Sequence, residues 1–143
     1  MTIYQLAQVN VSRMRGPLSS PDMGAFVAAV DPIQRLAAES RGFVWQVRDT
    51  VDSHVVNVSV WESYEALHAF TYRSRHGALV RRRAEWFRPT RQPSTALWWV
   101  PAGQRPTVDE ALRRLALLRA DGPSPRAFGL LRRFTPDGRP VSR

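Results

Sequence analysis

The sequence predicts an α+β domain with a ferredoxin-like split βαβ fold, in which one antiparallel four-stranded sheet packs against helices. Three observations predict this fold. Strand-like and helix-like segments follow one another in the order β-α-β-β-α-β, and the two middle strands are separated only by a short polar turn. The chain of 143 residues also fits one domain, since two independent cores of half that length would each be marginal.

The first strand and the first helix lie at the N-terminal end. Residues 3–11 alternate between apolar and polar side chains, as a half-buried strand does. A loop rich in Ser, Pro and Gly follows at 12–21. Apolar residues then repeat at helical spacing over 22–41, where Asp22 is placed to cap the helix and Pro32 predicts a kink.

A hairpin, a second helix and a fourth strand complete the unit. Residues 43–48 and 55–61 are rich in Val and aromatic residues, which favours strands, and a short turn at 49–52 joins them. Ser63 is placed to cap the second helix, whose apolar spacing continues as far as residue 83 or 87. Residues 95–100 form the fourth predicted strand.

A third helix and a basic tail follow the split βαβ unit. Thr107 is placed to cap this helix, and Gly122 ends it. We therefore expect residues 1–123 to form the ferredoxin-like domain. Residues 124–143 are expected to form a C-terminal basic tail or arm, which adds an edge strand or reaches over a partner.

The predicted sheet also indicates how the protein assembles. Both helices of the β-α-β-β-α-β unit are expected on one face of the sheet, so the opposite face is left uncovered. If that face is apolar, a second copy of the chain would cover it. We therefore expect a homodimer that closes into a dimeric α/β barrel.

Composition excludes several classes of function. The chain has no cysteine, which excludes disulfide scaffolds, thiol catalysis and thiolate metal sites. All 21 basic residues are arginine and the net charge is +9, but the arginines are scattered, as GC-rich codon usage produces, so no nucleic-acid partner is expected. There is no secretory signal and no apolar run near the ~20 residues that span a bilayer, so we expect a cytoplasmic protein without membrane contact.

Several motifs of the chain resemble DUF3291, a bacterial family of unknown function. They are NVSVWES at 57–63, ALHAF at 66–70, YRS at 72–74, His76, RRR at 81–83, EWF at 85–87 and LWWVPAG at 97–103, with QLAQVN at 5–10, GFVW at 42–45 and PTVDE at 106–110. The resemblance covers about residues 3–130. It implies a branch of the dimeric α/β barrel superfamily, which includes cofactor-free monooxygenases of antibiotic biosynthesis, haem-degrading enzymes, and small isomerases and cyclases.

One face of the second helix carries candidate catalytic residues. His68, Tyr72 and His76 are spaced i, i+4 and i+8, so an unbroken helix would place them on one side. We assign His76 as the acid/base and Tyr72 as a substrate-orienting residue. Alternatively, His76 is the axial ligand of a haem, or a hydrogen-bonded structural residue. No metal site is expected, because no carboxylate is placed to supply a third ligand.

One strand face carries polar groups beside an aromatic ring. Asn57, Ser59 and Trp61 alternate along the strand and so share a face, and Asn10 adds an amide from the neighbouring strand. Such amides hold an enolate-like oxygen in cofactor-free oxygenation and in isomerisation by proton transfer. We therefore assign Asn57 to catalysis and Asn10 to substrate binding. The alternative is that both amides satisfy backbone groups and that Trp61 belongs to the core.

Aromatic and cationic side chains complete the predicted site. The aromatic residues assigned to the wall of a pocket for a flat, apolar substrate are Trp45, Trp61, Trp86 and Trp98. Trp98 and Trp99 are consecutive, so they must face opposite sides of the sheet. Arg73 is assigned to substrate binding through a carboxylate or phosphate. For the arginines at 81–83, the same role is the alternative to a solvated helix face paired with Glu85, which is the favoured interpretation.

These observations lead to three hypotheses for function. The first is a small-molecule tailoring enzyme of bacterial specialised metabolism. It would act without a nucleotide cofactor on a hydrophobic, aromatic or polyketide-like substrate, as a monooxygenase or as an isomerase or cyclase by proton transfer. The second is a haem-binding or haem-degrading protein, and the third is a non-catalytic dimeric ligand-binding module. The scaffold hosts all three, so the fold does not choose among them.

Overall fold

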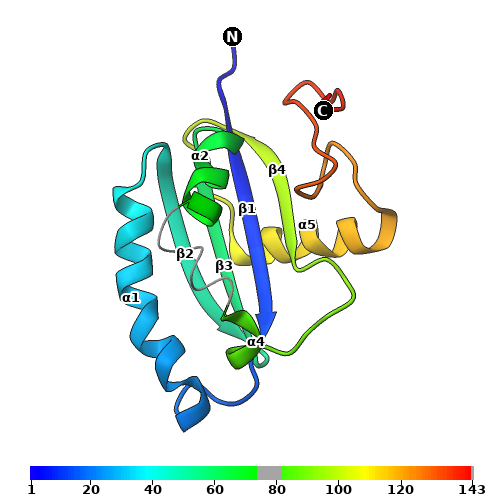
Figure 1. Cartoon of the computed structure of the whole chain (residues 1–143). Helices are drawn as coiled ribbons and strands as arrows, with labels where there is room; N and C mark the ends of the chain where they lie inside the picture. The colour runs from blue at the N-terminus through cyan, green and yellow to red at the C-terminus, as the bar shows by residue number, and fades with distance from the viewer. Residues whose placement is uncertain (74–81, 143) are drawn as a thin grey trace.

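Four strands form a single antiparallel sheet in the computed structural model, which describes residues 1–73 and 82–142, with Arg73 described only by its backbone. The strands are β1 (Tyr4–Arg13), β2 (Phe43–Val51), β3 (His54–Trp61) and β4 (Thr95–Pro101). Their order across the sheet is β2-β3-β1-β4 (Figure 1), and every neighbouring pair is antiparallel. This is the sheet of the predicted ferredoxin-like unit, so the predicted fold is confirmed.

Helices pack on both sides of this sheet. They are the 3-10 turn η1 (Pro21–Met23), α1 (Gly24–Glu39), α2 (Tyr64–His68), the π-helical turn η2 (Ala69–Arg73), α4 (Arg83–Trp86) and α5 (Val108–Asp121). Helix α1 continues through Pro32 as one element, and Asp22 lies in η1 instead of capping α1. The predicted cap of α2 is confirmed, since Ser63 Oγ accepts a hydrogen bond from the backbone N–H of Ala66 at 3.1 Å. Among the described residues, no helix combines the length and the apolar character needed to cross a membrane.

The hairpin between β2 and β3 is tighter than the sequence predicts. Residues 49–51, expected in the turn, continue β2, and the chain reverses at Asp52 and Ser53. Both turn residues have positive φ, 47° and 65°, as a two-residue type I′ turn requires. Because this turn matches the twist of the flanking strands, the two strands stay paired as far as Val51 and His54.

Alternation of side chains gives the sheet two different faces. One face is largely apolar and includes Ala7, Val9 and Val11 of β1, Val56, Val58 and Val60 of β3, and Ala96, Trp98 and Val100 of β4. On the other face, Leu6, Trp61 and Leu97 form a second buried cluster at one end, and Val55 packs with Trp86 and Phe87 near the other end. Polar side chains, including Gln8 and Asn10, occupy the rest of that face. The predicted alternation along β1 is therefore confirmed.

Helix α5 packs against the largely apolar face of the sheet (Figure 1). Ala111, Leu115 and Leu118 lie in the same buried cluster as the strand residues, because they repeat at helical spacing along one side of α5. The structure thus differs from the expectation that this face is left open for a second copy. Pairing of two copies stays a prediction, but an uncovered sheet face no longer supports it.

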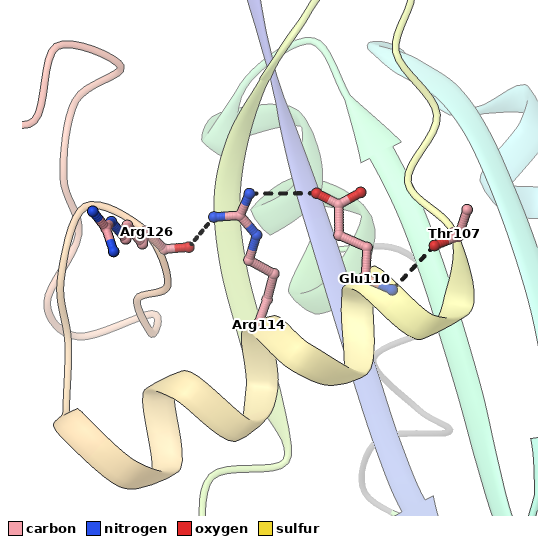
Figure 2. Close-up of polar contacts among 4 residues, drawn as sticks. All are labelled: Thr107, Glu110, Arg114 and Arg126. Atoms are coloured by element: carbon pink, nitrogen blue, oxygen red, sulfur yellow. Dashed lines mark hydrogen bonds and ion pairs between the residues drawn. The ribbon is translucent and has the colours of Figure 1, made fainter.

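Polar contacts fix the start of α5 and tie the helix to the chain that follows it (Figure 2). Thr107 Oγ1 accepts a hydrogen bond from the backbone N–H of Glu110 at 3.0 Å, which confirms the predicted N-cap. Glu110 forms an ion pair with Arg114, one turn further on, at 3.3 Å. Arg114 also donates to the backbone carbonyl of Arg126 at 2.9 Å. Helix α5 and the C-terminal chain therefore hold each other in place.

The segment 124–142, expected as a tail or arm, is anchored on the outer edge of β4. The backbone N–H of Phe128 donates to Leu97 at 2.9 Å, and its carbonyl accepts from Leu97 at 2.8 Å. The side chain of Phe128 is only 1% exposed. Further along, Trp99 Nε1 donates to the carbonyl of Phe134 at 2.7 Å. This segment completes the core beside β4 and covers the edge of the sheet.

Candidate functional site

A cavity lies between the polar part of the sheet and the inner side of α1. Its volume is about 240 Å³, below the roughly 300–1,000 Å³ of sites for drug-sized ligands. The strands form its floor, and α1, α2, η2 and α4 form its walls. Its polar and aromatic lining includes Gln8, Asn10, Ser12, Arg48, Asn57, Ser59, Trp61, Tyr72, Arg83 and Trp86.

A row of polar side chains crosses the sheet beneath this cavity. Backbone pairing places Arg48 of β2 opposite Asn57 of β3, Asn57 opposite Asn10 of β1, and Asn10 opposite Thr95 of β4. All four line the cavity, because directly opposed residues point to the same face of a sheet. Asn57 is exposed and its side chain makes no hydrogen bond to the described residues, so its amide is open to a ligand.

A chain of hydrogen bonds fixes the amide of Asn10. Arg83 Nη2 donates to Ser12 Oγ at 2.7 Å, and Ser12 Oγ donates to Asn10 Oδ1 at 3.2 Å. Asn10 Nδ2 in turn donates to Thr95 Oγ1 at 2.8 Å. Because an amide oxygen can only accept, the hydroxyl proton of Ser12 points to Asn10 Oδ1, while the hydroxyl oxygen accepts from the guanidinium. The oxygen of Asn10 thereby accepts one hydrogen bond, while its NH₂ group keeps one N–H for the cavity.

A second chain fixes the amide of Gln8 in the same sense. Trp61 Nε1 donates to Ser59 Oγ at 2.9 Å, and Ser59 Oγ donates to Gln8 Oε1 at 3.1 Å. The amide oxygen can only accept, so Ser59 again directs its proton to an amide oxygen while its own oxygen accepts from the indole N–H. The NH₂ group of Gln8 is left for the cavity.

Removing the Ser59 hydroxyl should therefore destabilise the protein. We expect Ser59→Ala to lower the free energy of unfolding by about 1–3 kcal/mol, because the buried indole N–H of Trp61 loses its partner. Urea denaturation followed by tryptophan fluorescence measures this loss. The control is Ser19→Ala, whose side chain is exposed, with an expected change within about 0.5 kcal/mol. Equal losses in the two variants would contradict the assigned role of Ser59.

Apolar and aromatic side chains close the cavity above its polar floor. Helix α1 contributes Phe26, Ala29, Val30 and Ile33. The ring of Phe26 lies 5.6 Å from that of Trp86 and 5.0 Å from that of Phe87, measured between centroids. On the α2 side, Trp61 stacks on Phe70 with centroids 5.1 Å apart. A ligand in the cavity therefore meets apolar walls and a polar floor.

The structure brings five of the predicted site residues together. Those that line the cavity are Asn57, Asn10, Tyr72, Trp61 and Trp86. His68 lines it as well, and the centroids of the His68 and Tyr72 rings are 4.8 Å apart. The predicted i, i+4 proximity of these two side chains is confirmed, although the chain changes there from α2 to the π-helical turn η2.

The remaining predicted residues are not among those that line the cavity. Trp45 and Trp98 lie on the opposite face of the sheet, with the residues that pack against α5, because the alternate positions Gln46 and Leu97 occupy the other face. His76 lies outside the described residues, as does the side chain of Arg73. The acid/base role of His76 and the haem alternative that depends on it therefore stay predictions. The described part of the chain contains no group of three side chains suited to hold a metal ion.

Two arginines that were not assigned to the site from the sequence, Arg83 and Arg48, line the cavity. Arg82 forms the expected ion pair with Glu85, at 2.6 Å. Arg83 instead reaches Ser12 on the cavity floor, because it lies one helical turn before the buried Trp86 and so shares its inward side. Strand alternation could have identified Arg48, because it lies two residues after Gln46 on β2 and therefore on the same face of the strand.

Arg83 is a partly buried cation without a counter-charge among the described residues. Burial lowers the pKa of its guanidinium, which nonetheless stays protonated at neutral pH. The ion pairs found in the described part of the chain join Arg82 to Glu85, Arg114 to Glu110, and Arg139 to Asp137. None of them involves Arg83, so its charge is available to a ligand.

The fold and this cavity together define the class of protein, a ferredoxin-like α+β domain with a cavity of mixed polar and apolar lining on one face of its sheet. The sequence matches the family described as "Domain of unknown function (DUF3291)" over residues 5–143. The chain belongs to this family, which confirms the resemblance seen in its motifs. A comparison with curated proteins gave no match.

Solved structures share the fold at low sequence identity. SnoaB from Streptomyces nogalater, described as a cofactor-independent oxygenase, has a TM-score of 0.51 and 14% identity, covering 71% of this chain and 95% of SnoaB. A conserved protein from Methanosarcina mazei has a TM-score of 0.53 and 11% identity, covering 68% of this chain and 92% of its own. For a protein from Mycobacterium tuberculosis the values are 0.52 and 16%, with 72% and 99% covered. At such identities the similarity concerns the fold.

Proposed function

We propose that the protein is a small-molecule tailoring enzyme of bacterial specialised metabolism that acts without a nucleotide cofactor on a hydrophobic, aromatic or polyketide-like substrate. The observation that carries this proposal is the polar row of Arg48, Asn57, Asn10 and Thr95 beneath apolar walls. A flat substrate lies with its rings against Phe26 and the indole walls, and its oxygens meet the amides of the floor. The fold shared with a cofactor-independent oxygenase supports the same class.

The proposed reaction begins with removal of a proton from a carbon next to a carbonyl group. The N–H groups of Asn57 and Asn10 stabilise the negative charge that then develops on the carbonyl oxygen. Tyr72 orients the substrate, and His76, assigned from the sequence, accepts the proton. In an isomerase the proton returns at another carbon, and in a cyclase the carbanion forms a carbon–carbon bond. In a monooxygenase the carbanion reduces O₂, so that a CH₂ group and O₂ give a C=O group and water.

Asn57→Ala tests this chemistry directly. The probe is anthrone, whose CH₂ group is acidic because its carbanion is delocalised onto a carbonyl oxygen. Exchange of these hydrogens in D₂O under nitrogen, measured by NMR, reports proton removal alone. We expect Asn57→Ala to slow the enzyme-dependent exchange about 100-fold, the usual effect of losing one oxyanion donor. The control is Gln104→Ala, which removes an exposed amide outside the cavity and should leave the rate unchanged.

Admission of oxygen then separates the candidate reactions. Exchange accompanied by O₂ uptake and formation of anthraquinone supports the monooxygenase. Exchange without O₂ uptake supports the isomerase or cyclase. A rate no faster than buffer, with anthrone nevertheless bound, favours the non-catalytic ligand-binding module and contradicts the proposed enzyme.

A further inference from the structure

We propose that the cavity selects an anionic ligand, an aromatic carboxylate, because the groups held in place on its floor are hydrogen-bond donors and cations. This inference rests on the proposed function in that it concerns the same cavity, and it names the chemical class of the substrate.

Two serine hydroxyls orient the amides on the floor of the cavity. The hydroxyls of Ser12 and Ser59 donate to the amide oxygens of Asn10 and Gln8, at 3.2 and 3.1 Å. Each hydroxyl oxygen also accepts a hydrogen bond from a group that can only donate, the Arg83 guanidinium in one case and the Trp61 indole in the other. Neither hydroxyl can turn its proton elsewhere without losing a bond. Each amide oxygen therefore already accepts one hydrogen bond, and each amide directs N–H groups towards a ligand.

The charged side chains that line the cavity are all cationic among the described residues. None of the described residues that line it is acidic, whereas Arg48 and Arg83 both line it. Arg48 lies beside Asn57 in the cross-strand row, and Arg83 is held against Ser12. A neutral ligand would displace water from Arg83 and leave its charge uncompensated, which is unfavourable. An anion supplies the missing charge and accepts from the same donors.

The shape of the cavity indicates which anion fits. The walls formed by Phe26, Trp86 and Trp61 accept a flat ring. A carboxylate lies in the plane of such a ring and presents two oxygens in the fork geometry of a guanidinium. The volume of about 240 Å³ favours a small aromatic acid over a larger conjugate.

Binding of 2-naphthoate and of its neutral isostere 2-naphthamide tests this inference on the unmodified protein. Both have the same ring and nearly the same shape, and only the acid is charged at pH 7. Dissociation constants are measured by isothermal titration calorimetry. We expect naphthoate to bind about 10-fold or more tightly than the amide, since charge-assisted hydrogen bonds are the stronger kind. Equal binding, or tighter binding of the amide, would overturn the inference.

Arg83→Gln tests whether Arg83 is the source of the preference for naphthoate over naphthamide. It should weaken naphthoate binding roughly 10- to 100-fold and change naphthamide binding little. The matched control is Arg88→Gln, which removes the same charge from an exposed position that does not line the cavity, and should leave both affinities within about 2-fold. Equal weakening of acid and amide in Arg83→Gln would show that Arg83 only shapes the cavity. If that variant unfolds, the comparison of naphthoate and naphthamide binding to the unmodified protein still tests whether the cavity prefers an anion.

The outcomes distinguish this inference from the proposed function. If the amide binds as well as the acid, the preference for anions fails and the small-molecule cavity stands. If neither compound binds at millimolar concentration, the cavity is not a site for flat aromatic ligands, and both the inference and the proposed function are contradicted.

Discussion

Replacing Phe128 with alanine is expected to lower the free energy of unfolding by about 3–5 kcal/mol, the range for a large aromatic side chain removed from a core. The Phe128 side chain is 1% exposed and belongs to the buried cluster that contains Trp61 and Leu97. Its ring also lies 5.9 Å from that of Phe134, between centroids. The two backbone hydrogen bonds to Leu97 do not depend on the side chain, so the measured loss reports packing.

Equilibrium unfolding in urea measures this loss, and Leu131→Ala is the matched control. Leu131 lies three residues further along the same segment, but its side chain is 83% exposed, so its removal should change stability by no more than about 0.5 kcal/mol. A loss below about 1 kcal/mol for Phe128→Ala would instead mean that segment 124–142 is a loosely attached arm. Because Leu130 of this segment lines the cavity, we also expect Phe128→Ala to weaken ligand binding.

Gly42→Ala is expected to destabilise the protein by about 2–5 kcal/mol for two separate reasons. Gly42 has a φ of +83°, a conformation that disfavours any side chain. An added Cβ would also lie 2.5 Å from the Cβ of Ala66 in α2, so α2 would have to move. The carbonyl of Gly42 accepts from Glu62 at 2.7 Å, one residue before the cap of α2, which leaves little room for that movement. Since α2 carries His68 into the cavity wall, we expect the site to be distorted as well.

Two other glycines separate the contributions to this effect. Gly103 also has positive φ, +90°, but an added Cβ there meets nothing within 4 Å, so Gly103→Ala should cost only about 1–2 kcal/mol. Gly24, at the start of α1, has ordinary helical φ and open space around it, so alanine there should be neutral or stabilise by up to about 1 kcal/mol. Thermal and urea unfolding of the three variants measures the order. If Gly42→Ala costs no more than Gly103→Ala, the close approach of Gly42 to Ala66 does not constrain α2.

The sequence by itself determined the features that depend on short-range periodicity and local hydrogen bonds. Side chains alternate along any strand, so Asn57, Ser59 and Trp61 had to share a face and Trp98 and Trp99 had to face opposite sides, as they do. Caps depend on residues only three positions apart, so those at Ser63 and Thr107 were predicted correctly. The order of these elements then gave the ferredoxin-like sheet, because few topologies accommodate it.

Only the tertiary structure decided which layer covers each face and which side chains meet across it. Alternation shows that Trp98 and Leu97 face opposite sides of the sheet, but not that α5 packs against the side of Trp98. The sequence therefore could not show that Trp45 and Trp98 lie on the face away from the cavity. Likewise, Arg82 and Arg83 are chemically identical neighbours, and the packing of α4 against β1 alone brings one of them to Ser12. Contacts between residues 71 positions apart depend on how whole elements pack, and no local pattern in the sequence specifies that packing.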